Sequence, residues 1–145
     1  MNELKVKIKL LYEDSILPRY ATDGSNGLDC VAHEVIYDDV HDLYRYPLGF
    51  AIEIPKGYVG LLFPRSSSPN RKLIMANCVG VIDSDFRGEP MATYNYKDNN
   101  IVYEVGEKVA QLVIVPAPVV KLEIVEDLSS TERGSKGHGS TGDKA

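Results

Sequence analysis

The sequence predicts an all-β fold, either a sandwich or a barrel, on two observations. First, short runs rich in valine, isoleucine, leucine and tyrosine recur along most of the chain. Second, glycine, proline, asparagine or aspartate separates most of these runs, and many short strands at regular spacing are typical of sandwiches and barrels. The length of 145 residues predicts one domain, and a hydrophobic content of 43% is enough for a buried core.

The first element is a half-buried strand from Leu4 to Leu10, where apolar residues alternate strictly with three lysines. Residues 12–28 contain Pro18, Gly24 and Gly27, so they are expected to form a loop.

Eight further strands are expected: Cys30–Tyr37, Leu48–Ile54, Tyr58–Phe63, Leu73–Asn77, Met91–Tyr96, Ile101–Val105, Val109–Val115 and Val119–Val125. One short helix, of a turn or two, is expected near Ser67–Lys72, with Pro69 in its first turn.

The chain changes character after Leu128. Residues 129–145 contain no large apolar residue, so they cannot build a core. We therefore expect a β-barrel domain at residues 1–128 and a flexible C-terminal arm at residues 129–145.

Composition excludes several classes of function. A net charge of −5 argues against a nucleic-acid partner. The sequence has no run of about 18 apolar residues and no signal-peptide pattern. We therefore expect a cytoplasmic protein that is not exported and has no membrane partner. Cys30 and Cys78 lack a zinc or CxxC spacing and are expected to be reduced thiols, and His33, His41 and His138 show no metal-ligand pattern.

The most informative stretch runs from Gly80 to Glu89. An apolar pair leads into Asp83, a second acid follows at Asp85, and Phe86 comes next. In a continuous strand the two acids would share one face and Phe86 would lie on the other. A carboxylate beside a planar ring suits a catalytic site, whereas a hairpin with solvated acids is the simpler interpretation.

Four other polar stretches punctuate the chain: residues 21–29, 64–68, 106–111 and 133–142. Taken singly, the first three have structural interpretations as an Asx turn, a helix cap and a structural amide at Gln111. The last could be a disordered terminus. However, its alternating glycines, two cations and hydroxyls are what wrapping a phosphate chain requires.

In this order the five stretches resemble the five motifs of the homotrimeric all-β dUTPases. The matching residues are Gly24–Asp29, Pro64–Ser67, Asn77 with Gly80–Gly88, Gly106–Gln111 and Arg133–Gly142. The resemblance implies a distorted jelly-roll-like β-barrel with at most one short helix and a flexible C-terminal arm.

The resemblance also implies an activity, the hydrolysis of dUTP to dUMP and pyrophosphate by attack of water on the α-phosphorus. This reaction lowers dUTP and supplies dUMP for thymidylate synthesis. Asp83 matches the acid that orients and deprotonates the water. A magnesium ion chelated by the triphosphate is implied as cofactor, and Asp29 matches the acid that holds the metal's waters.

The other implied substrate contacts follow the motifs. Those to the phosphates are Arg65, Ser66, Ser67, Gln111, Arg133, Gly139, Ser140 and Thr141. Those to uracil and deoxyribose are Asn77, Gly80, Val81, Ile82, Asp83, Phe86 and His138, and Met91 matches a further, weaker substrate contact. A hairpin built for uracil presents the wrong polarity to cytosine, and the ring of Phe86 leaves no space for a 2′-hydroxyl.

Two positions depart from the family pattern. Phe86 stands where tyrosine is common, so the ring remains and its hydroxyl is lost. His138 stands where phenylalanine is common, and imidazole offers less apolar area for stacking on uracil, so weaker stacking is expected.

The resemblance further implies a homotrimer whose sites lie between subunits. One chain would supply Asp29, Arg65 and Gln111, a neighbour the Asp83 hairpin, and the third its arm, which is expected to order only with nucleotide and magnesium bound. Two alternatives remain: a dUTP-binding regulatory protein with slow or no turnover, and a dCTP deaminase with Glu89 as its acid. The intact Asp83 favours a catalyst, and the arm favours a pyrophosphatase.

Overall fold

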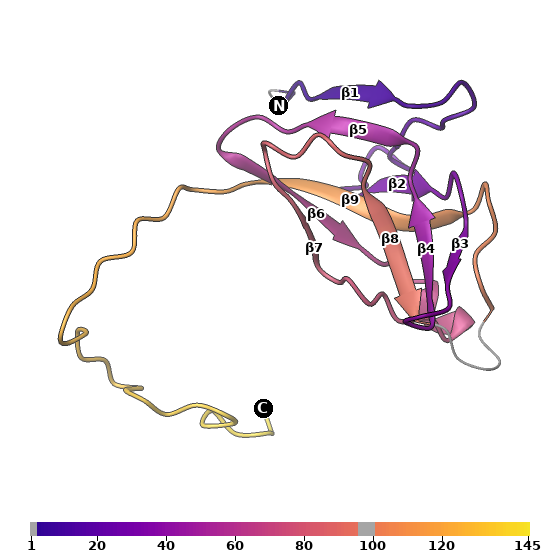
Figure 1. Ribbon diagram of the computed structural model, residues 1–145. Coiled ribbons are helices and arrows are strands. Elements are labelled where there is room, and N and C mark those ends of the chain that lie inside the picture. Colours follow the sequence, from indigo (N-terminus) through magenta and orange to yellow (C-terminus); the bar gives the residue numbers. More distant parts are fainter. Residues whose placement is uncertain (1–2, 96–100) are drawn as a thin grey trace.

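The computed structural model describes residues 3–95 and 101–145, and their regular secondary structure is almost entirely β (Figure 1). The strands and the single 3₁₀ helix are β1 (Lys7–Leu10), β2 (Leu28–Val31), β3 (Ile36–Asp38), β4 (Leu43–Pro47), β5 (Phe50–Glu53), β6 (Tyr58–Phe63), η1 (Ser68–Arg71), β7 (Gly80–Ile82), β8 (Met91–Asn95) and β9 (Lys108–Pro116). They form three sheets, in the orders β1-β5, β2-β9-β6-β7 and β3-β4-β8. Every strand pair is antiparallel, and the all-β prediction is confirmed.

Strand β9 organises the largest sheet because it pairs with β2 on one side and with β6 on the other. In this register Gln111 lies opposite Asp29 in β2 and opposite Phe63 at the end of β6. On the far side of β6, Gly60 pairs with Ile82 of β7. The polar motifs that flank these strands are therefore placed by one sheet.

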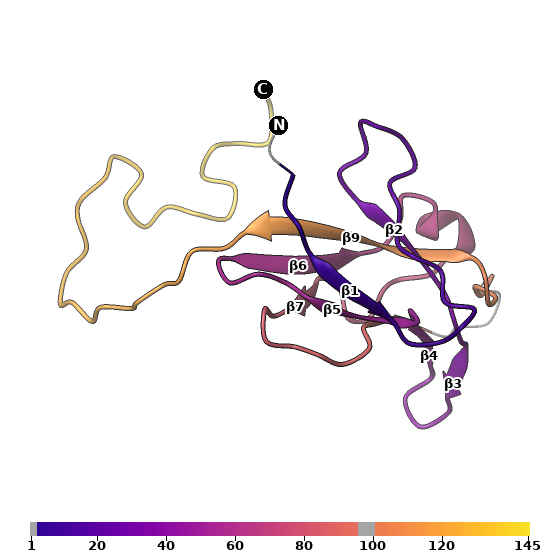
Figure 2. The same ribbon diagram turned by 90° about the horizontal axis from the view of Figure 1, so that it is seen from above.

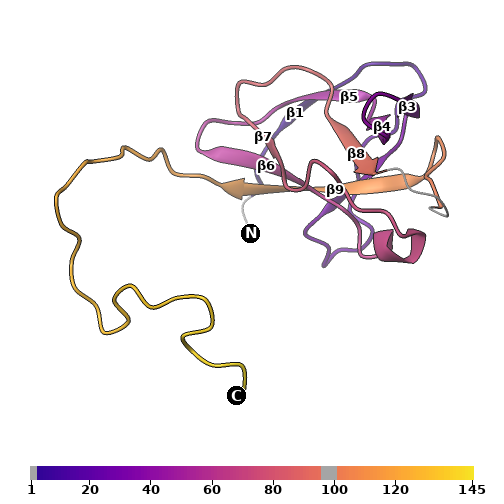
Figure 3. The same ribbon diagram turned by 60° about the horizontal axis from the view of Figure 1, so that its bottom comes forward.

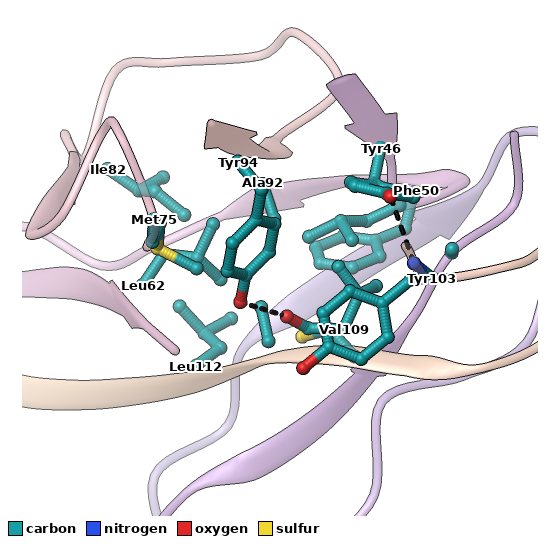
Figure 4. Close-up of a cluster of buried hydrophobic side chains, with 14 of the residues drawn as sticks. Tyr46, Phe50, Leu62, Met75, Ile82, Ala92, Tyr94, Tyr103, Val109 and Leu112 are labelled. Atoms are coloured by element: carbon teal, nitrogen blue, oxygen red, sulfur yellow. Dashed lines mark hydrogen bonds between the residues drawn. The ribbon is translucent and has the colours of Figure 1, made fainter. Parts of the chain in front are cut away.

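Tyrosines fill much of the core, as Figure 4 shows. Tyr46, Tyr94 and Tyr103 are almost fully buried and pack ring against ring. The Tyr94 hydroxyl donates to the carbonyl of Val109 at 2.6 Å, and the Tyr46 hydroxyl accepts from the Tyr103 amide at 3.1 Å. Burial raises the pKa of Tyr46 to about 12. The core thus buries two phenol groups at low cost because their hydroxyls have partners.

Several predicted elements are confirmed. Tyr58–Phe63 coincides with β6, and Val109–Val115 lies within β9. The helix prediction corresponds to η1, which has proline in its first turn.

Three other predicted strands are present with different limits. The strand predicted from Leu4 begins only at Lys7, and the one predicted from Leu48 begins at Phe50. The strand predicted to end at Tyr96 is β8, and Tyr96 itself lies outside the described residues.

The prediction of one strand at Cys30–Tyr37 is wrong, because the chain there crosses between two sheets. The amide of Ala32 donates to Glu107 beside β9, and the next amide, that of His33, donates to Pro47 in β4. The run therefore divides into β2 and β3, which belong to different sheets.

Two short strands were not predicted. The first, β4, forms a hairpin with β3, and its signal is the polar turn at residues 39–42 between two tyrosine-containing runs. The second, β7, has only three residues, which is too few for a periodic pattern to be recognised.

Three further strand predictions are wrong. Leu73–Asn77 makes only an isolated bridge, through Met75 to Tyr94. Ile101–Val105 is irregular, although the amide of Ile101 donates to the Arg71 carbonyl. Val119–Val125 has no strand partner among the described residues.

Beyond β9 the chain leaves the barrel, which Figures 2 and 3 show from two further sides. The amide of Ala117 donates to the Gly57 carbonyl at 2.7 Å, and every residue from 118 to 145 is exposed. Within the described part of the chain, no helix has the length and apolar character needed to span a bilayer.

Candidate functional site

Three motifs that are distant in sequence meet where β2, β9 and the end of β6 lie side by side. Asp29 of β2 faces Gln111 of β9, and Gln111 faces Phe63, two residues before Arg65. Lys108 stands at the start of β9. We call Asp29, Arg65, Lys108 and Gln111 the phosphate cluster, after the ligand that two of its members were predicted to bind.

Asp29 joins the two cations of the phosphate cluster. Its Oδ1 lies 3.1 Å from Arg65 Nε, and its Oδ2 lies 3.0 Å from Lys108 Nζ. The Asp29 side chain is only 13% exposed, whereas Lys108 remains 49% exposed. Two cations on one carboxylate leave a net positive charge, and this arrangement is suited to an anionic ligand.

A cavity of about 450 Å³ opens beside this cluster. It is lined by Arg65, Ser67, Asn70, Arg71, Tyr103, Glu107 and Lys108. Within this lining the Arg71 guanidinium binds both oxygens of Glu107, at 3.1 and 2.7 Å, and lies 4.3 Å from the centre of the Tyr103 ring. The hydrogen bonds from Arg71 lower the pKa of Glu107. The charge of Arg71 is thus paired with that of Glu107, and Arg65 and Lys108 supply the remaining positive charge of the cavity lining.

Gln111 is positioned by close packing as well as by a hydrogen bond. Its Nε2 donates to the carbonyl of Pro64 at 3.0 Å. A Cβ atom on Gly27 would overlap Gln111 Oε1 and would lie 3.2 Å from Gln111 Cβ. Glycine at position 27 therefore leaves room for this amide, which links the first, second and fourth motifs.

In the phosphate cluster, the carboxylate of Asp29 is the group that suits a magnesium ion. Among the residues that the structure describes, no three His, Cys, Asp or Glu side chains come together to hold a metal. Asp29 already accepts one bond on each oxygen, but a carboxylate offers about four acceptor positions. Asp29 can therefore accept hydrogen bonds from the waters of a hydrated cation, whereas the described residues offer no full set of ligands for a bare ion.

A second pocket, of about 290 Å³, lies beside β7. It is lined by Leu62, Asn77, Gly80, Val81, Ile82, Asp83, Phe86, Glu89, Pro90 and Met91. It gathers all the residues predicted to contact uracil and deoxyribose except His138. We call it the β7 pocket.

The continuous strand considered for residues 80–89 is not present. Strand β7 ends at Ile82, and a turn follows in which the Phe86 amide donates to the Asp83 carbonyl at 3.1 Å. This turn, and not strand pleating, brings the ring of Phe86 and the exposed carboxylate of Asp83 to the same pocket.

Asn77 anchors the loop before β7 to β8. Its Nδ2 donates to the Met91 carbonyl at 3.1 Å, and its Oδ1 accepts from the Thr93 amide at 3.0 Å. The amide keeps one N–H for a ligand. Asn77 thus has a structural task that its sequence motif did not indicate.

The two sites are separate cavities of one chain. Ile82 of β7 pairs with Gly60 of β6, and Asp83 follows Ile82, whereas Arg65 follows the end of β6 at Phe63. Among the residues that the structure describes, the two pockets share no lining residue.

Among the residues that the structure describes, none from the fifth motif lines either pocket. Its hydrogen bonds are local, such as those from Arg133 Nε to the Lys136 carbonyl at 3.0 Å and from the Gly142 amide to the Gly139 carbonyl at 2.9 Å. Ser140 and Thr141 are exposed, as is His138.

Two outcomes concern individual residues. Ser66 lies next to Arg65 but lines neither pocket, whereas Ser67 lines the first. Lys108 was not predicted, although its place as the cation of the fourth motif, three residues before Gln111, is a signal that could have identified it.

The chain is similar to known proteins in sequence and in fold. The family model described as dUTPase matches residues 13–142. A deoxyuridine 5'-triphosphate nucleotidohydrolase of Hydrogenobaculum sp. is 42% identical over 147 residues, which cover 97% of this chain and 100% of that protein. One from Hahella chejuensis is 41% identical and covers 97% of this chain and 96% of that protein.

The fold also matches solved structures. The dUTPase of Staphylococcus bacteriophage 80alpha, solved with dUPNHPP, superposes with a TM-score of 0.81 at 28% identity, covering 96% of this chain and 99% of that chain. The predicted jelly-roll-like barrel is thereby confirmed. On the match of the family model and the identity to these relatives, the chain belongs to the dUTPase family.

Proposed function

We propose that this chain hydrolyses dUTP to dUMP and pyrophosphate, and that Asp83 is the base. The observation that carries the proposal is the β7 pocket, where a carboxylate and an aromatic ring border a cavity formed by a strand edge. The relatives named for this activity, more than 40% identical, support it.

The β7 pocket suits a pyrimidine and a deoxyribose. Gly80 and Ile82 lie on a short strand whose backbone can pair with the polar edge of uracil, and Phe86 and Met91 supply apolar surface for the sugar. Buried polar groups that pair with one base are left unpaired by another, which gives strong discrimination against cytosine.

In the proposed reaction Asp83 accepts a proton from a water molecule. The oxygen of that water forms a bond to the α-phosphorus at the same time. The bond from that phosphorus to the bridging oxygen breaks, and pyrophosphate leaves. A positioned carboxylate contributes roughly 100- to 10,000-fold as a general base. The remaining acceleration comes from charge neutralisation and positioning of the phosphates.

We assign the phosphates to the cluster of Arg65, Lys108 and Gln111, together with Ser66 and Ser67 of the adjacent turn. Magnesium, where bound to the triphosphate, would neutralise charge on the phosphates. Asp29 would then hold its waters while keeping Arg65 and Lys108 in place.

We further propose that the working form is a homotrimer. The distribution of Asp83 and Arg65 over two different pockets supports it, because a trimer can bring the base of one chain to the phosphate-binding residues of another. The apolar residues of segment 119–128 support it as well: Leu122 is 88% exposed and Ile124 is 100% exposed, which a solitary chain would not favour.

We further propose that residues 129–145 form a flexible arm of the domain at residues 1–128, in which residues 118–128 already lie outside the barrel. Arg133, Gly139, Ser140 and Thr141 would bind the β- and γ-phosphates, with His138 stacked on uracil. The exposure of every residue in this segment supports a role that begins only when a ligand is present.

The test is pyrophosphate release from dUTP, dCTP, dTTP and UTP with magnesium, by the wild type and Asp83→Asn. Rapid release from dUTP alone, lost in the variant, is the expected result. Tight binding of dUTP without release would support the regulatory alternative. Release of ammonia from dCTP would support the deaminase alternative, and either outcome would overturn the proposal.

A further inference from the structure

The ring of Phe86 is folded back onto Gly88. A Cβ atom built on Gly88 would lie 2.7 Å from Phe86 Cζ and 2.9 Å from Cε2, both too close for real Cβ contacts. The ring therefore occupies the space that any side chain at position 88 would need. The same ring lines the β7 pocket, and Phe86 is 41% exposed.

The backbone around this contact is fixed more firmly than the ring. Arg87 Nη1 donates to the carbonyls of Ser84, at 2.7 Å, and Phe86, at 3.0 Å, and the Phe86 amide closes the turn onto Asp83. Gly88 is not among the glycines with a positive φ, so alanine is not excluded there by backbone conformation. An added methyl group would consequently displace the ring and leave the turn in place.

We propose that Gly88 is a positioning residue that seats the Phe86 ring against the deoxyribose and thereby sets discrimination between deoxyribo- and ribonucleotides. The inference rests on the proposed function, since it requires that the β7 pocket binds the sugar. Gly88 does not touch the substrate, and its effect passes entirely through the ring. Such an effect must disappear when the ring is removed.

The test is a double-mutant cycle with Gly88→Ala, Phe86→Leu and the double variant. The readout is the ratio of kcat/KM for dUTP to that for UTP. Gly88→Ala is expected to lower this ratio at least tenfold, as is Phe86→Leu. In the Phe86→Leu background, Gly88→Ala is expected to change the ratio less than twofold.

A second readout needs neither turnover nor metal: the ratio of the dissociation constants of dUMP and UMP, measured by calorimetry. It is expected to follow the same pattern. If the wild type proves catalytically inactive, the proposed function fails, and this binding ratio still tests the role of Gly88.

Thermal unfolding of the variants shows whether a changed ratio comes from a folding defect. If Gly88→Ala lowers Tm because the methyl group overlaps the ring, the double variant should recover Tm. Two results would overturn the inference: an unchanged ratio in a folded Gly88→Ala protein, or an equal loss with and without the Phe86 ring.

Discussion

The phosphate cluster and the C-terminal arm are both proposed to bind one triphosphate, yet they are built in opposite ways. In the cluster, Asp29 holds Arg65 and Lys108 in ion pairs of 3.1 and 3.0 Å before any ligand arrives. In the arm, Arg133 bonds only to its own turn, and every residue is exposed.

The difference shows how a site can divide its tasks. Preorganised charges lose little freedom when a ligand binds, so they favour recognition. A segment that orders on binding loses much more, but it can cover the ligand and leave with the product. Changes in the cluster should therefore affect both stability and activity, whereas changes in the arm should affect activity alone.

The largest effect is expected from Asp83→Asn, which removes the chemistry and leaves both phosphate-binding regions intact. Because the amide cannot accept the water's proton, kcat should fall roughly 100- to 10,000-fold. The dissociation constant for dUTP should change by only a few fold. Single-turnover kinetics and calorimetry would measure the two quantities, and a kcat within tenfold of wild type would contradict the assignment of Asp83.

Truncation after Ser130 tests the arm directly. It removes Arg133 and the hydroxyls proposed to bind phosphate, and kcat/KM should fall on the order of 100-fold or more, since each charge-assisted hydrogen bond contributes about 1.5–3 kcal/mol. The Tm should be unchanged, because the lost residues make no buried contact. A truncated enzyme with full activity would remove the arm from the mechanism.

Arg65→Ala and Arg133→Ala form a matched pair for the comparison. Both remove one guanidinium, and each should raise KM roughly 10-fold or more. Only Arg65→Ala should also lower Tm, by a few degrees, because it leaves the shielded Asp29 carboxylate with Lys108 alone. Equal Tm values for the two variants would show that the cluster is no more preorganised than the arm.

His138→Phe should give the smallest effect. A larger apolar ring improves stacking on uracil, so KM for dUTP should fall about two- to threefold, within the range that aromatic pairs contribute. Stability should not change, since His138 is exposed. An unchanged KM would mean that residue 138 does not stack on the base.

Local pattern was enough for the regular elements of the barrel. Tyr58–Phe63 and Val109–Val115 were predicted because each run is rich in apolar residues and is flanked by residues typical of turns. The prediction of one strand at Cys30–Tyr37 failed because the amides of Ala32 and His33 pair with two different sheets. The residue pattern of one segment contains no information about its partners. Val119–Val125 has strand character but no partner within the described chain.

The sequence by itself determined the family and the order of the motifs, because the residue types and spacings that define them are local and are read along one chain. Tertiary structure alone decided which of those residues meet. Strand register placed Lys108 beside Asp29, a turn placed the Phe86 ring against Gly88, and the fold placed Asp83 and Arg65 in two different pockets. These contacts are non-local. They depend on which strands pair and where the chain crosses between sheets, and neither can be inferred from the residues of a single segment.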